Sequence, residues 1–380
     1  MEYLQYIHSV CQPDPNADNI RYLISGVDHQ VREKLGWNIV NSIYKAGKIL
    51  FILDNTQEKK NLTDFGRYKI VNPLNTGVKL CDNLFEVSSA REISRLRSLL
   101  TELGFEASKV MKVVQYLSIV KETEKCLGNQ GPLCMETLEE YSGSELVKWK
   151  MGQLVNLGKL TTESYTYLLT RYAEVRAAAA DFEMFLVMLA PFIEGDPPCP
   201  ETAIHLTIGE FASDRPMQQV MCRIILSFIK KNPEVSSVLI LDDGKGNRDC
   251  IIDLLKNLPV ATEAHMLTGD AFSLSDSDRD VLMSTFPVRI YSRHESMESC
   301  SKIEACCGQI DVVKHSYTTT VDKRIRASTA LDMLFGTNRT EAEIRNAPVR
   351  EARYRKEMIH SLCLGTAIID CGGTQVLFRF

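Results

Sequence analysis

Residues 237–243 read SVLILDD, a run of four apolar residues that leads into two carboxylates. A short, continuous apolar run is typical of a strand that is buried on both faces of a parallel sheet. Carboxylates at the carboxyl end of such a strand face the crevice where α/β proteins bind ligands, and they can hold Mg²⁺ directly or through water. Asp242 and Asp243 are therefore candidate catalytic residues of a Walker B-like strand, with Asp242 as the candidate Mg²⁺ ligand. An acidic turn that caps a buried strand is the structural alternative.

Strands and helices alternate on both sides of this run. Apolar runs of strand length occur at residues 21–25, 48–54, 68–71, 203–208, 263–267 and 287–291. Residues 28–45 and 213–231 carry apolar residues at helical spacing. The last sixteen residues, GTAIIDCGGTQVLFRF, predict a β-hairpin that turns at Gly372 and Gly373. We therefore expect a mostly parallel sheet with helices on both faces.

The middle of the chain has a different pattern of apolar residues. Between residues 83 and 195 the apolar residues recur at helical spacing, without a convincing strand. The adjacent prolines of GDPPCP, residues 195–200, cannot continue a helix and mark a boundary. We therefore predict that an all-α domain (83–195) is inserted into an α/β domain. The α/β domain then consists of a first part (1–82) and a second part with the C-terminal hairpin (196–380).

Composition narrows the class of protein. The 380 residues are 44% hydrophobic and 24% charged, which is typical of a soluble globular chain, and the net charge of −5 argues against a surface that binds polyanions throughout. The N-terminus lacks a signal-peptide pattern, and the longest apolar run, residues 184–193, is shorter than the about 20 residues that span a bilayer. Twelve cysteines without a C-x-x-C pair indicate reduced thiols. We expect a cytoplasmic protein without a membrane span of its own, which partners could recruit to a membrane complex.

The turn after the first predicted strand is where a phosphate-binding loop would lie. The working pattern, G-x-x-x-x-G-K-[ST], uses glycine N–H groups, a lysine and a hydroxyl to hold phosphates and Mg²⁺. Residues 26–33 read GVDHQVRE, so Gly26 is present, but Val31, Arg32 and Glu33 replace the second glycine, the lysine and the hydroxyl residue. Valine resists the positive φ that glycine supplies, which favours an ordinary strand–helix turn. Gly26, Arg32 and Glu33 are the candidate cofactor-binding positions.

A basic segment near the C-terminus is a candidate nucleic-acid interface. Residues 345–356 hold four arginines and a lysine, and we interpret them as an arginine-rich helix. A charge run on a helix is more often a solvated face than a binding surface. The candidate nucleic-acid-binding residues are Arg350, Arg353, Arg355 and Lys356.

In its order of features, the chain resembles the soluble ATPase domain of type IV secretion coupling proteins, the TraG/TraD-like branch of the FtsK/HerA superfamily. The likeness rests on the strand, the P-loop position, the helical insertion, the Walker B-like strand, SRHESMESCSKIEACCGQ (residues 292–309), SYTTT (residues 316–320), the late basic segment and the terminal hairpin. The resemblance implies a RecA-like, P-loop NTPase-type α/β domain with an inserted all-α domain, assembled into a hexameric ring. It also implies ATP and Mg²⁺ as ligands, and recruitment of DNA–protein substrates to a secretion channel during conjugation.

The sequence departs from the family pattern where the nucleotide would be held. Besides the altered loop, Asp243 stands where a Walker B glutamate is expected, and the sensor strand ends in Thr268 and Gly269 instead of glutamine. We therefore expect a catalytically degenerate ATPase-like protein, without ATP and Mg²⁺ as working cofactors. It would act as a structural or adaptor subunit in a homo- or hetero-oligomer with ATPase homologues. Two alternatives stay open: an active ATPase motor with an unusual P-loop that translocates DNA or protein, and a DNA-binding module that uses the C-terminal basic helix.

Overall fold

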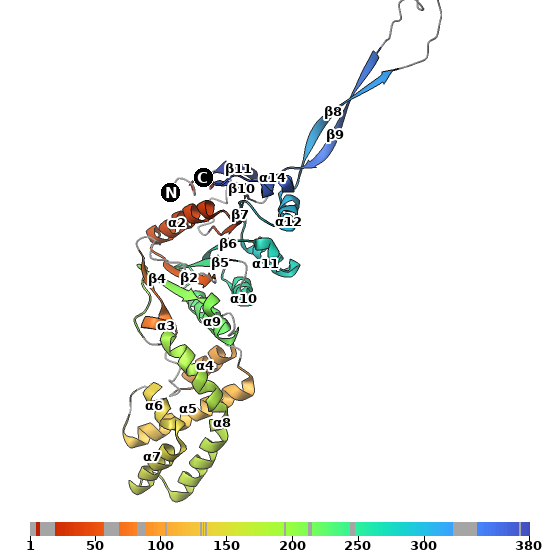
Figure 1. Cartoon of the computed structure of the whole chain (residues 1–380). Helices are drawn as coiled ribbons and strands as arrows, with labels where there is room; N and C mark the ends of the chain where they lie inside the picture. The colour runs from red at the N-terminus through yellow and green to blue at the C-terminus, as the bar shows by residue number, and fades with distance from the viewer. Residues whose placement is uncertain are drawn as a thin grey trace, which may run out of the picture.

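The computed structural model describes residues 5–7, 20–56, 68–81, 89–102, 105–129, 131, 133, 135–193, 195–211, 215–243, 248–321, 340–371 and 374–380. Its centre is a nine-stranded sheet with the order β11-β10-β7-β1-β6-β5-β2-β4-β3 (Figure 1). The strands are β1 (Tyr22–Ser25), β2 (Ile49–Asn55), β3 (Lys69–Val71), β4 (Thr202–Thr207), β5 (Ser236–Asp242), β6 (Glu263–Thr268), β7 (Val288–Tyr291), β10 (Thr366–Asp370) and β11 (Gln375–Arg379). The strands from β7 to β3 in this order pair in parallel, and β10 and β11 add antiparallel pairs at one edge. The predicted mostly parallel sheet is confirmed, and the two terminal strands pair antiparallel as predicted, whereas the turn predicted at Gly372 and Gly373 lies outside the described residues.

Both faces of the sheet are buried because alternate residues of each strand enter different cores. In β2, Phe51 and Leu53 belong to one hydrophobic cluster, and Leu50 and Ile52 belong to the other. The second cluster includes the apolar stripe of α2 (His29–Lys45), and the first includes α9 (Arg215–Lys231) and α10 (Asp249–Asn257). The remaining helices around the sheet are α3 (Pro73–Thr76), α11 (Asp276–Thr285), α12 (Met297–Cys307) and α14 (Lys356–His360). The continuous apolar strands of the sequence therefore mark a sheet covered on both sides.

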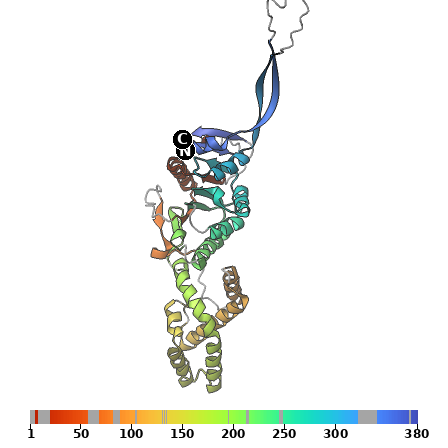
Figure 2. The ribbon, with the colours of Figure 1, turned by 45° about the vertical axis from the view of Figure 1, so that its right-hand side comes forward.

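The chain between β3 and β4 is helical. Its helices are α4 (Ala90–Glu102), α5 (Ala107–Leu127), α6 (Met135–Ser142), α7 (Ser144–Asn156) and α8 (Thr162–Ile193). Figures 1 and 2 show that they form a body that extends away from the sheet. A buried polar cluster ties three of them together, because Glu124 of α5 accepts hydrogen bonds from Tyr141 of α6 (2.7 Å) and Lys150 of α7 (2.7 Å). We propose that these helices form an inserted domain of residues 83–195, between the two parts of the α/β domain at 1–82 and 196–380.

The predicted arginine-rich helix over residues 345–356 is wrong. Residues up to 352 belong to β9 (Thr340–Ala352), which pairs antiparallel with β8 (Gln309–Val321), and α14 begins only at Lys356. Figures 1 and 2 show this two-stranded ribbon extending away from the sheet. Pro348 lies in the segment and is incompatible with a helix interior, and the facing strand is rich in β-branched residues. The run of charged residues therefore belongs to the strand β9, which is formed by pairing with β8 earlier in the chain.

Two further expectations concern the whole chain. Among the described residues, no helix combines the length and the apolarity needed to cross a bilayer. Cys371 is disulfide-bonded, so the expectation of reduced thiols throughout is wrong at this position. The free cysteines of the described part are Cys81, Cys126, Cys199, Cys222, Cys250, Cys300, Cys306, Cys307 and Cys363.

Candidate functional site

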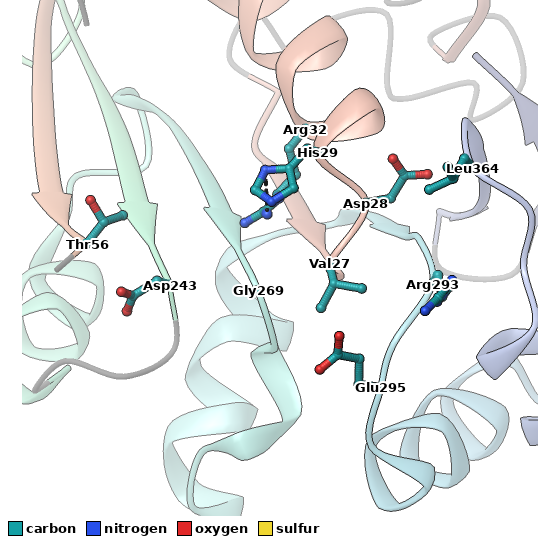
Figure 3. Close-up of a pocket in the computed structure, with 10 residues that line it drawn as sticks. All are labelled: Val27, Asp28, His29, Arg32, Thr56, Asp243, Gly269, Arg293, Glu295 and Leu364. Atoms are coloured by element: carbon teal, nitrogen blue, oxygen red, sulfur yellow. Dashed lines mark hydrogen bonds between the residues drawn. The ribbon is translucent and has the colours of Figure 1, made fainter. Parts of the chain in front are cut away.

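The carboxyl ends of five parallel strands open onto one cavity of about 450 Å³. Its lining comes from the turn after β1 and the start of α2, from the segments that follow β2, β5, β6 and β7, and from the segment before β10 (Figure 3). The lining residues are Val27, Asp28, His29, Arg32, Thr56, Asp243, Gly269, Arg293, Glu295 and Leu364. Because β1 lies between β6 and β7, the cavity is at a point where the chain crosses from one half of the sheet to the other. Open α/β sheets bind their ligands at such a point.

The turn between β1 and α2 is a closed, capped helix start. Only three residues, Gly26, Val27 and Asp28, separate the strand from the helix. The Asp28 carboxylate accepts the backbone N–H groups of Gln30 (2.9 Å) and Val31 (3.4 Å), and through its other oxygen that of Gly365 (2.6 Å). Figure 3 shows this carboxylate turned toward Leu364, the neighbour of Gly365. The N–H groups at the start of α2, which could attract an anion, are therefore bound to an internal carboxylate.

Gly26 serves the packing of this turn. Its φ is +132°, and a Cβ at this position would overlap the Ser292 hydroxyl and lie 2.8 Å from the carbonyl oxygen of Arg293. The neighbouring N–H of Val27 donates to the same carbonyl at 2.9 Å. The glycine at the P-loop position thus allows the segment after β7 to approach the backbone of the turn.

We expect Gly26→Ala to destabilise the protein by at least about 2 kcal/mol more than Gly128→Ala, because overpacking adds to the cost of the positive φ. Gly128 is a matched control, since its φ is +104° and nothing lies within 4 Å of its hypothetical Cβ. Urea denaturation of both variants measures the difference. Equal losses of stability in the two variants would contradict the packing role of Gly26.

Of the three predicted cofactor-binding positions, Arg32 lines the cavity. Its Nη2 lies 3.2 Å from Nδ1 of His29, and burial lowers the pKa of the guanidinium, opposed by the charges of Asp28, Glu33 and Asp243. Glu33 is exposed on α2. The single predicted cation of the loop is therefore placed among acidic groups of the protein itself.

The two predicted Walker B-like carboxylates have different surroundings. Asp243 lines the cavity, whereas Asp242 is buried and both of its oxygens are bound. Its Oδ2 lies 2.6 Å from Nη2 of Arg248 and accepts from Thr268 at 2.7 Å, and its Oδ1 accepts from Asn55 at 3.0 Å. Arg248 thus holds the carboxylate that would be the candidate Mg²⁺ ligand of an active ATPase.

Arg248 is the main residue that sequence reasoning missed. Its guanidinium also donates to the Ser273 hydroxyl (3.0 Å) and to the Asp270 carbonyl (3.1 Å), so it joins the segments that follow β5 and β6. The only signal in the sequence is a basic residue six positions after Asp242. In the part of the chain that the structure describes, no group of three or more His, Cys, Asp or Glu side chains is placed to hold a metal ion.

The predicted nucleic-acid-binding residues lie in β9, in the segment after it and at the start of α14, and none of them lines the cavity. Arg350 is in β9, and Arg353 and Arg355 follow it, all three exposed. Arg353 donates to the Gln375 side-chain oxygen and Arg355 to Glu351, each at 2.8 Å. The backbone N–H of Lys356, the fourth candidate, donates to a carboxylate of α12.

The fold is that of an α/β protein with a mostly parallel sheet, and the cavity lies at the carboxyl ends of its strands. No family model and no curated protein matches the sequence. The solved structure of the unbound bacterial conjugative coupling protein TrwBdeltaN70 is similar, with a TM-score of 0.50 and 13% identity, over 96% of this chain and 84% of that chain. TrwB in complex with a non-hydrolysable ATP analogue has a TM-score of 0.49 and 13% identity, over 94% of this chain and 84% of that chain. VirB4 of Thermoanaerobacter pseudethanolicus has a TM-score of 0.46 and 10% identity, over 98% of this chain and 92% of that chain. The chain has the fold of the conjugative coupling protein TrwB, which confirms the predicted fold class.

Proposed function

We propose that this chain is a catalytically degenerate ATPase-like protein, related to conjugative coupling proteins, that works as a structural or adaptor subunit. The observation that carries the proposal is the Asp28 carboxylate, which binds the N–H groups at the start of α2. An anion-binding loop needs those N–H groups free, and it needs a backbone of glycines where this chain has a helix. A sheet of the coupling-protein type would then serve assembly, with ATPase homologues as partners and DNA or protein as the transferred substrate.

The residues around the cavity do not fit a magnesium-bound triphosphate. Three carboxylates, those of Asp28, Asp243 and Glu295, line it together with the guanidinium groups of Arg32 and Arg293. Phosphate oxygens would have to displace or neutralise these carboxylates, which costs electrostatic energy at short range. Asp242 could bind Mg²⁺ only after giving up Arg248, so the active-ATPase alternative has less support. The DNA-binding alternative loses its basic helix, because that segment is a strand. Arg350, Arg353 and Arg355 are nevertheless exposed and could still contact DNA.

The test is a thermal-shift titration of the whole chain with Mg·ATP, combined with a phosphate-release assay. We expect no rise in the melting temperature at millimolar Mg·ATP and no phosphate release above the buffer rate. A competent site filled at a thousand times its dissociation constant would add about 4 kcal/mol to the free energy of unfolding. A rise of several degrees that is abolished by Arg32→Ala would overturn the proposal and favour the active ATPase.

A further inference from the structure

Two stretches of chain connect the sheet to the helical body, and they are hydrogen-bonded to each other. They are residues 77–81, where the chain leaves the sheet, and residues 191–193 and 195–196, where it returns. The backbone N–H of Val78 donates to the carbonyl of Pro191 (2.8 Å), and that of Lys79 donates to the carbonyl of Asp196 (3.1 Å). The outgoing stretch therefore lies between the end of α8 and the segment that follows it. We call these paired stretches the joint.

The outgoing stretch also caps the end of α8. The last four carbonyl groups of an α-helix have no partner within the helix. The helix α8 ends at Ile193, and the carbonyl of Phe192 accepts the backbone N–H groups of Leu80 (2.8 Å) and Cys81 (3.1 Å) and the Cys81 thiol (3.4 Å). A movement of the helical body against the sheet would leave these groups without partners, which is unfavourable because their residues are buried.

The hydrophobic core is continuous across the joint. Val78, Leu80 and Phe192 are buried, and they belong to the same cluster as Phe51 of β2 in the sheet and Tyr116 of α5 in the helical body. A flexible linker between domains is usually exposed and has few contacts across it. The joint differs from such a linker in both respects, because it combines backbone hydrogen bonds with shared side-chain packing.

Two glycines allow the stretches to approach each other closely. The φ angles of Gly77 and Gly195 are +67° and +98°, in the region that favours glycine. A Cβ on Gly195 would lie 2.6 Å from the carbonyl oxygen of Gly77 and 2.7 Å from its carbonyl carbon. Both contacts are with backbone atoms, so no side-chain rotation could relieve them. Any larger residue at position 195 would therefore push the two stretches apart.

We propose that the joint locks the helical body to the sheet in one orientation, so that the two parts move and unfold as a single unit. A partner bound to the helical body would then keep a fixed distance from a partner bound to the sheet. The lock does not depend on whether the cavity binds a nucleotide, so a failure of the proposed function would leave it unchanged.

The two tryptophans of the chain report the two parts separately. Trp37 lies in α2, which packs on the sheet, and Trp149 lies in α7 of the helical body. The variants Trp37→Phe and Trp149→Phe each keep one of them. In each variant we expect the urea denaturation curve from fluorescence to coincide with the curve from circular dichroism, because a single cooperative unit has one transition. Fluorescence and circular-dichroism curves that separate in either variant overturn the proposal.

Gly195→Ala, added to each of these variants, is expected to uncouple the two parts, so that the fluorescence and circular-dichroism curves separate. Gly128→Ala is the matched control, because the φ of Gly128 is +104° and nothing lies within 4 Å of its hypothetical Cβ. It introduces a similar backbone strain away from the joint, and its curves should still coincide. Curves that coincide in Gly195→Ala as they do in Gly128→Ala show that the joint does not couple the parts, and overturn the proposal.

A distance measurement tests the orientation in the folded protein. Electron spin labels are attached through unnatural amino acids at Tyr167 of α8 and at Val260 beside the sheet, which are 63% and 90% exposed, because the chain has twelve cysteines. With no other change in the chain, we expect one narrow distance peak between the labels, and Gly195→Ala should broaden it. A broad or two-peaked distribution without Gly195→Ala overturns the proposal, even where Gly195→Ala fails to fold.

Discussion

Replacing Arg248 with methionine is expected to destabilise the fold by about 3–5 kcal/mol. The substitution leaves the Asp242 carboxylate buried without its cation, and an uncompensated buried charge is among the most costly defects in a protein interior. Arg248 is itself buried and joins the segments after β5 and β6, so its loss also removes the bonds to Ser273 and Asp270. Methionine keeps most of the apolar volume, which separates the loss of charge from the loss of packing.

Urea denaturation measures this effect. Arg171→Met is the matched control, because Arg171 forms an exposed pair with Glu174 and its loss should change the stability only slightly. In the double variant Asp242→Asn with Arg248→Met both charges are gone, so we expect it to be more stable than Arg248→Met alone. An Arg248→Met variant as stable as Arg171→Met would mean that the ion pair does not hold this edge of the sheet.

The sheet could be predicted from the sequence because its strands are buried on both faces. Runs such as residues 49–53 and 238–241 need no knowledge of their neighbours, since every side chain in them is apolar whichever way it points. The ribbon was missed for the opposite reason. Residues 340–352 mix charged and apolar groups, and only pairing with residues 309–321 makes them a strand. Pro348 was the available signal against a helix.

The candidate site was partly predictable for a related reason. The carboxyl ends of parallel strands converge, so residues that follow them, such as Asp243 and Gly269, could be expected at one place. The roles of Asp28 and Arg248 could not be read in the same way. The Asp28 cap also binds the N–H of Gly365, and Arg248 reaches across loops, so both depend on contacts between distant parts of the chain. A carboxylate in a P-loop position argues against an anion site there, but only the fold shows that this carboxylate accepts the N–H groups at the start of α2.

Glu263 is expected to make the stability of the protein depend on pH in the acidic range. This residue begins β6, at the sheet edge opposite to the cavity, and its carboxylate lies 2.9 Å from Lys48 and 2.9 Å from His265. Burial raises the pKa of Glu263, but the hydrogen bonds and charges of His265 and Lys48 outweigh burial and lower the pKa from 4.5 to about 2. Since the folded pKa lies below the unfolded one, the stabilisation is complete above about pH 5 and is lost as the pH falls toward 2.

We expect Glu263→Gln to cost about 3 kcal/mol at neutral pH, because a pKa difference of about two and a half corresponds to about that free energy. The gap between wild type and variant should narrow steadily below about pH 4.5, since protonation turns the wild-type side chain into a neutral group like glutamine. Urea denaturation at a series of pH values measures the gap. Glu298→Gln, which alters an exposed pair with Lys302, should show a small gap at every pH. A gap for Glu263→Gln that stays constant down to about pH 3 would show that packing, and not the charge of Glu263, stabilises this edge of the sheet.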